Sequence, residues 1–205
     1  MQLPDTISRI SRFAFLPALM AVAPVVSAEP AKFTVDSEHF SMAFEIMHIG
    51  YAPVIGMFRE VDGEFVYDEA TGDLNSGTLV FQSDSVFTNH KKRDDHLRGE
   101  DFLNSAKYPE IVFTLTEFES TGENAGKVTG DLTMLGQTNP VVLDVTLNKS
   151  AVYPIGHEDF TLGISAETIL KRSDWGMTYG LDSALVGDEV RMRFGFEANR
   201  DSGWF

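Results

Sequence analysis

The chain has 205 residues, with 31 acidic and 16 basic side chains and a formal net charge of −15. A field of this sign repels phosphate backbones, so the composition argues against nucleic-acid binding. The sequence contains no cysteine, which excludes disulfides and a lipid-modified N-terminal cysteine.

The first residues have the features of a secretory signal peptide. Arg9 and Arg12 precede an apolar run over residues 13–26, and small residues lead up to Ala28. The run is shorter than the about 20 residues that a transmembrane helix needs, and two prolines interrupt it. We therefore expect cleavage of residues 1–28. We also expect that the protein is not an integral membrane protein, because no later segment could span a bilayer as a helix.

Strand-like alternation begins soon after this segment. A short extended entry at residues 33–37 precedes Ser41–Ile49, in which Phe44, Ile46 and His48 share one face. Because that face should point inwards, we expect a buried His48 with a hydrogen-bonding partner.

Two further apolar segments follow, over residues 53–68 and 77–88, and a polar loop separates them. The first contains Asp62-Gly63, a dipeptide that is typical of a tight turn or a β-bulge.

The alternation stops at residues 91–103. This stretch has no β-branched residue, and the spacing of its apolar side chains indicates one or two short helices broken near Gly99. Because Asn104 and Tyr108-Pro109 end the pattern, we expect a short helical insertion near residues 91–104. Strand character returns at residues 110–119.

The clearest pattern lies at residues 126–147, where two alternating segments predict a β-hairpin with one apolar and one polar face. The residues Gly136–Asn139 supply the expected turn, and Pro140 stands at the expected first position of the second strand, where it need not donate a ladder hydrogen bond.

The last two strands are expected at residues 160–167 and 190–197. About eight short strands with turn signals and no internal repeat indicate an all-β antiparallel sandwich or barrel in a single domain over residues 29–205. Periodicity leaves open which of the two forms, and whether the apolar faces enclose a solid core or a cavity. An eight-stranded barrel has about the size at which either is found.

Several blocks of the sequence, in their order, resemble the YceI-like domain family. The first runs from Val35-Asp36-Ser37 through His39 to Phe44–His48, and Phe40 stands where family members commonly have a serine. The resemblance covers Lys32–Ala198 and rests on residues 35–48, 55–58, 85–88, 93–98, 101–103, 107–113, 130–141 and 175–177.

The resemblance implies a lipocalin-like, extended eight-stranded antiparallel β-barrel that is exported to the bacterial periplasm. Family members bind an isoprenoid chain, such as a polyprenyl phosphate or a quinone tail, in a hydrophobic pore. The resemblance brings no catalytic motif, so we expect no enzyme activity, no catalytic residue, no metal and no cofactor. An isoprenoid lipid is the expected partner, and a homodimer is one oligomeric state that the sequence leaves open.

The expected pore lining consists of inward-facing strand residues together with Trp175. The candidates are Phe44, Ile46, His48, Phe58, Phe81, Phe113, Leu115, Leu132, Met134, Leu143, Val145, Ile164 and Trp175. The headgroup candidates at the rim are His96, Arg98 and Tyr179. Packing in a solid core is the competing interpretation for the apolar residues, and a structural histidine is the competing one for His48.

Two other functions stay open at this point. One is an eight-stranded outer-membrane barrel with its apolar faces outward. The other is an enzyme that acts on a bound lipid through His48 and Asp95, although the polar cluster around Asp95 lacks a recognised metal-ligand spacing and a nearby nucleophile.

Overall fold

A computed structural model describes residues 29–201, so the predicted signal peptide lies outside the described residues. The elements are β1 (Ala31–His48), β2 (Ala52–Phe58), β3 (Val61–Asp68), β4 (Asp73–Gln82), η1 (Ser83–Ser85), β5 (Val86–Phe87), α1 (Lys91–Leu97), β6 (Glu110–Gly122), β7 (Ala125–Met134), β8 (Gln137–Val152), β9 (Phe160–Lys171), η2 (Arg172–Trp175) and β10 (Val186–Arg200).

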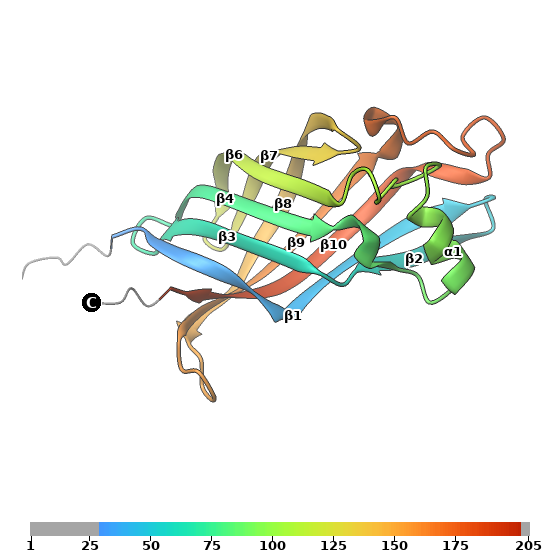
Figure 1. The fold of residues 1–205 in the computed structure, drawn as a ribbon. Helices are drawn as coiled ribbons and strands as arrows, with labels where there is room; N and C mark the ends of the chain where they lie inside the picture. The colour runs from blue at the N-terminus through green and yellow to red at the C-terminus, as the bar shows by residue number, and fades with distance from the viewer. Residues whose placement is uncertain (1–28, 202–205) are drawn as a thin grey trace, which may run out of the picture.

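The strands form a closed antiparallel barrel (Figure 1). Neighbours around the barrel are β10, β9, β8, β7, β6, β4, β3 and β1, and the pairing of β1 with β10 closes the ring. The long strand β1 pairs with β3 through Ala31–Thr34 and with β2 from Ala43 onward. This closure confirms the eight-stranded barrel and rules out the sandwich.

The helical insertion is confirmed and is shorter than predicted. Helix α1 begins after His90, whose Nδ1 accepts a hydrogen bond from the Arg93 backbone N–H, and turns replace the helix beyond Leu97. No helix within residues 29–201 has both the length and the apolar character needed to cross a membrane.

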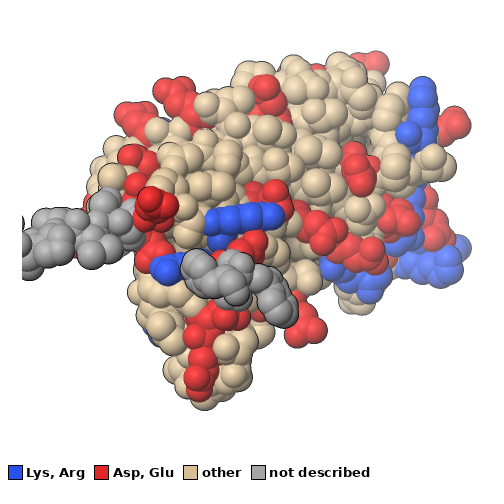
Figure 2. Space-filling model, turned by 60° about the vertical axis from the view of Figure 1, so that its left-hand side comes forward, with Lys and Arg blue, Asp and Glu red and all other residues tan. Residues whose placement is uncertain are grey.

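Most strands turn an apolar face into the barrel. Val128, Leu132 and Met134 of β7 are buried, whereas Lys127 lies outside and pairs with Asp144 of β8 at 2.8 Å. The outer face that Figure 2 shows carries many carboxylates, and its lysines and arginines gather in a few places. This is the reverse of the arrangement that an outer-membrane barrel requires.

The prediction of a turn or bulge at Asp62-Gly63 was wrong. Residues 59–60 only interrupt the strand, because β2 and β3 both run antiparallel to β1, and Gly63 lies within β3 opposite Leu79 of β4. A Cβ at Gly63 would stand 2.4 Å from Leu79 Cδ2, so the glycine permits close packing rather than a turn.

The hairpin of β7 and β8 is confirmed, but its turn is shorter than predicted. Leu135 and Gly136 alone form the turn, with φ of 54° and 73°, and Pro140 lies inside β8 opposite Asp131. The strand tolerates Pro140 because β8 pairs with β9 only from Asp144 onward, so no second ladder needs the missing N–H.

Gly130 of β7 gives a direct test of this packing. The Phe113 ring from β6 covers the glycine, and a Cβ there would lie 2.2 Å from Phe113 Cζ and 2.6 Å from the Thr114 carbonyl oxygen. We expect Gly130→Ala to lower the free energy of unfolding by about 1–3 kcal/mol, because the backbone oxygen cannot yield as a side chain can. Urea denaturation measures the change, and an unchanged midpoint would contradict this close approach.

Candidate functional site

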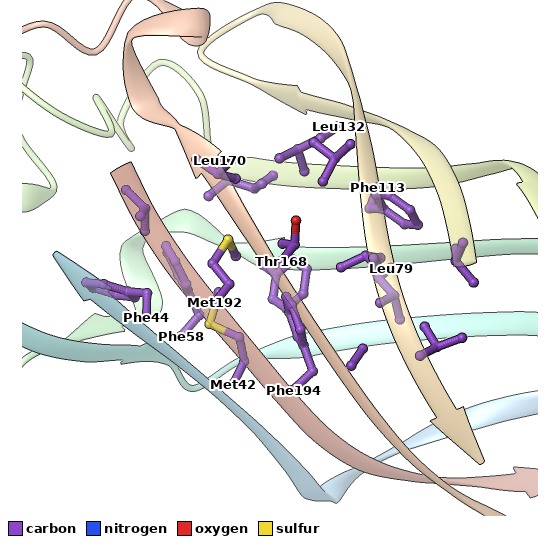
Figure 3. A pocket seen from close by; sticks show the side chains of 18 of the residues that line it. Met42, Phe44, Phe58, Leu79, Phe113, Leu132, Thr168, Leu170, Met192 and Phe194 are labelled. Atoms are coloured by element: carbon purple, nitrogen blue, oxygen red, sulfur yellow. The ribbon is translucent and has the colours of Figure 1, made fainter. Parts of the chain in front are cut away.

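The barrel encloses a cavity of about 750 Å³ that runs along most of its length. Figure 3 shows side chains from opposite walls pointing into this space, with Met42 and Phe44 from β1, Phe113 from β6 and Leu170 from β9. Thr168 carries the only oxygen among the labelled side chains, and its Oγ1 already donates to the Val142 carbonyl at 2.8 Å. The middle of the cavity is therefore apolar.

Phenylalanine rings form one wall of the cavity. The centroids of Phe44 and Phe58 lie 5.9 Å apart, those of Phe58 and Phe81 lie 6.2 Å apart, and Phe194 follows at 6.3 Å from Phe81. Because the rings support one another along the wall, they line the interior without filling it. The cavity volume lies in the range of small-molecule sites, about 300–1,000 Å³.

All of the predicted pore residues except Trp175 line this cavity. They are Phe44, Ile46, His48, Phe58, Phe81, Phe113, Leu115, Leu132, Met134, Leu143, Val145 and Ile164. Of the three headgroup candidates, His96 and Tyr179 also line it.

Trp175 and Arg98 lie elsewhere. Trp175 is 2% exposed, and its indole N–H donates to the Leu132 carbonyl at 2.9 Å, so it packs behind the wall. Arg98 donates to the carbonyls of Asp84 and Val86 and pairs with Asp95, and it thereby fastens the end of α1 to η1 and β5.

Exposed residues line the cavity at both of its ends, and we call the end beside α1 the mouth. There the His96 ring forms T-shaped pairs with Phe102 and Tyr179, whose centroids are 5.0 and 5.1 Å away, and so joins α1 to the segment 176–185. His48 also lines the mouth, but it is exposed rather than buried as predicted, because β1 extends to the rim where it pairs with Val186.

The charged groups of the lining are divided between the two ends. Arg93 of α1 and Arg172 of η2 lie at the mouth, near His48 and His96. The two lining carboxylates belong to Glu64 of β3 and to Glu123 in the turn between β6 and β7. Among the described residues, the lining at the mouth therefore contains two arginines and no carboxylate, and the nearby Asp101 carboxylate lies 2.8 Å from His96 Nε2.

Arg172 is a buried cation, and no carboxylate of residues 29–201 is in salt-bridge contact with it. Its guanidinium donates to the carbonyls of Met177, Tyr179, Val186 and Gly187 at 2.6–3.0 Å. Burial lowers the pKa of Arg172 from its ordinary value, and the Asp188 carboxylate opposes that shift. These bonds hold segment 176–187 across the mouth.

Asp94 anchors α1 from the inside. It is 5% exposed and accepts hydrogen bonds from the Thr88 backbone N–H and hydroxyl, while Arg93 donates to the Thr88 hydroxyl and carbonyl at 2.7 Å. Burial alone would raise the pKa of Asp94, but the Thr88 hydrogen bonds and the nearby Arg98 and Arg93 lower it overall from 3.8.

Asp94→Asn is expected to lower the free energy of unfolding by about 1.5–3 kcal/mol at pH 7, because a charged acceptor is lost from a buried site. The lowered pKa means that the carboxylate stabilises the native state above its unfolded pKa and loses this effect as the pH falls through the native value. Denaturation at pH 7 and at pH 3 measures the free energy of unfolding of both proteins. The difference between the unaltered protein and Asp94→Asn should be smaller at pH 3 than at pH 7. An equal difference at pH 7 and at pH 3 would contradict the stabilising role of the ionised Asp94 carboxylate.

One polar cluster on the outside of the barrel was not predicted from the sequence. His39 Nδ1 lies 2.8 Å from Asp36 Oδ2 and 4.0 Å from Glu197 Oε2. The hydrogen bond and charge of Asp36 raise the pKa of His39. Residues three apart in a regular strand face opposite sides, and only the irregular register of β1 between Val35 and Phe40 brings Asp36 and His39 together.

Comparison with known proteins agrees with this geometry. The model of the YceI-like domain family matches residues 33–198. The chain belongs to the YceI-like family. A curated relative, the UPF0312 protein of Pseudomonas savastanoi pv. phaseolicola, is 36% identical over 162 residues, which are 78% of this chain and 82% of that protein.

Solved structures show the same barrel. BcnA of Burkholderia cenocepacia superposes with a TM-score of 0.72 at 23% identity, over 80% of this chain and 99% of that one. A polyisoprenoid-binding domain of Saccharophagus degradans superposes with a TM-score of 0.63 at 15% identity, over 82% of this chain and 98% of that one. These likenesses establish the YceI-like fold.

Sequence reasoning missed part of the lining of this YceI-like barrel. Met42 of β1 and Met192 of β10 each lie on an alternating apolar face, and that pattern was a signal for both. Arg172 gave no such signal, because it follows a strand and acts through backbone carbonyls that only the fold brings near it.

Proposed function

We propose that this protein binds an isoprenoid lipid and holds its tail in the barrel cavity. The observation that carries the proposal is the apolar space of about 750 Å³ that extends from the mouth to the turn between β6 and β7. Each buried methylene contributes about 0.8 kcal/mol, so a lined tunnel can hold a long tail without specific chemistry. The likeness to a polyisoprenoid-binding domain supports the same ligand class.

The headgroup lies at the mouth in this proposal. Arg93 and Arg172 provide the cations of the lining there, whereas Glu64 and Glu123 belong to other parts of the wall. A phosphate headgroup suits this environment through charge, because the guanidinium groups of Arg93 and Arg172 are positive while most of their N–H groups already donate to Thr88 and to backbone carbonyls. Of the two ligands that the family resemblance implies, the polyprenyl phosphate therefore suits this mouth better than the quinone.

We propose binding rather than catalysis. Asp95, which an enzyme hypothesis would use together with His48, does not line the cavity and is paired with Lys91 at 2.7 Å and Arg98 at 3.4 Å. The expected signal peptide supports a periplasmic location, and cell fractionation tests this point: recovery in the cytoplasmic fraction would contradict it.

Organic extraction of the purified protein followed by mass spectrometry tests the ligand class. We expect an isoprenoid lipid at close to one molecule per chain. Recovery of a stoichiometric ligand of another class, or of none from protein purified without detergent, would contradict the proposal.

A further inference from the structure

The hairpin between β1 and β2 exposes an uncharged apolar surface beside the cavity mouth. Residues 46–58, which read IMHIGYAPVIGMF, contain no Asp, Glu, Lys or Arg, in a chain with a net charge of −15. Tyr51 is 90% exposed and Ile55 is 57% exposed. We call the exposed side chains of this region the mouth patch: Met47, Ile49, Tyr51, Ile55, Met57 and the adjoining Leu185.

Strand pairing makes the mouth patch continuous with the cavity. Ile55 and Met57 follow each other on the outer face of β2, Met47 lies opposite Pro53, and the Ile49 N–H donates to the Leu185 carbonyl at 3.0 Å. Met47 and Leu185 also line the cavity. Figure 1 shows the hairpin, α1 and the segment before β10 at the same end of the barrel.

The turn of this hairpin is strained in a way that packing does not explain. Ile49 has a φ of +51° and Gly50 a φ of +72°, a geometry for which Asn-Gly is the favoured pair and a β-branched residue is an outlier. Leu135 has a similar φ of +54° in the turn after β7, but it packs against the main core. Ile49 is 45% exposed and belongs to neither core cluster of the described residues.

We propose that the mouth patch docks the protein on a lipid bilayer. This inference rests on the proposed function, because a tail that enters the mouth from a bilayer need never cross water. A tyrosine and aliphatic side chains suit the interface between headgroups and acyl chains. The acidic remainder of the molecule is repelled by anionic headgroups, so the uncharged hairpin is the part that approaches a bilayer at the least electrostatic cost.

Flotation with vesicles of phosphatidylcholine and phosphatidylethanolamine tests the docking. We expect the unaltered protein to float with the vesicles. For the double variant Ile49→Asn, Tyr51→Ser, we expect the fraction bound to vesicles to fall by about tenfold or more. Asparagine favours the backbone conformation of residue 49, so the variant should keep its fold. The matched control is Val152→Ser, Ile155→Asn, which removes two exposed apolar side chains near the β8–β9 connection at the other end of the barrel and should float like the unaltered protein.

Equal flotation of the mouth variant and the unaltered protein would overturn the docking, and so would equal losses in both double variants. If the unaltered protein does not float and sedimentation shows a dimer that the mouth variant breaks, the patch joins two copies instead. Uptake of a polyprenyl phosphate from detergent micelles, followed by native mass spectrometry, separates the two proposals. Uptake without flotation removes only the docking, whereas absence of uptake removes the lipid-binding function.

Discussion

A tryptophan in place of Ala166 is expected to weaken lipid binding roughly a hundredfold while the barrel stays folded. Ala166 lies on the inner face of β9, opposite Val145 of β8 and Phe194 of β10, and all three line the cavity. The indole would enter the tunnel rather than a packed core. If it displaces about four methylenes of the tail, the loss is about 3 kcal/mol, or roughly a hundredfold in affinity.

The control for this variant is Ile169→Trp on the same strand. Ile169 is 50% exposed and points outward opposite Arg191, so its replacement adds the same ring outside the barrel. We expect Ile169→Trp to bind lipid normally, and both variants to unfold within about 1 kcal/mol of the unaltered protein. Equal lipid content in the three proteins, measured by native mass spectrometry, would show that the tail does not pass Ala166.

Arg172→Met is expected to lower the free energy of unfolding by about 2–4 kcal/mol, because four backbone carbonyls lose their donor while the aliphatic packing stays similar. The effect should concentrate on segment 176–187, which those carbonyls hold over the mouth. Chemical denaturation measures the total, and hydrogen exchange at residues 177–187 measures the local opening.

Arg172→Lys serves as the companion variant. Lysine keeps the charge but has no planar fork, so it cannot reach four carbonyls on one segment, and most of the loss should persist. Recovery of full stability with lysine would mean that the charge of residue 172, and not its donor geometry, supports the mouth.

The alternating strands were predictable because burial on one side imposes a period of two on the residues. Phe44, Leu132 and Ile164 come from distant parts of the sequence, and each was placed on an inner face from its immediate neighbours alone. Trp175 shows the limit of this reasoning. It follows a strand in η2, where no period applies, and its place behind the wall depends on a hydrogen bond to Leu132.

The ends of the elements were harder to predict than the strands. Asp62-Gly63 has the composition of a turn, but tertiary packing against Leu79 requires the glycine within a strand. Similarly, a proline is typical of the first position of a strand, whereas the structure tolerates Pro140 at an interior position of β8 that has only one strand neighbour. Both cases depend on partners that are distant in sequence.

The hollow interior could not be derived from the sequence either. The same alternation of apolar residues fits a filled barrel and a lined one, because periodicity gives directions and not distances. The cavity follows from the size of the eight-stranded ring and from the chain of rings formed by Phe44, Phe58 and Phe81 along the wall.

A crystal structure of the protein purified without detergent tests the central claim most directly. The proposal predicts continuous tubular electron density from the mouth beside Arg172 and His96, past Ala166, towards the turn at Glu123, with the headgroup at the mouth. A cavity that contains only discrete water molecules, or that has collapsed onto its own side chains, would contradict it.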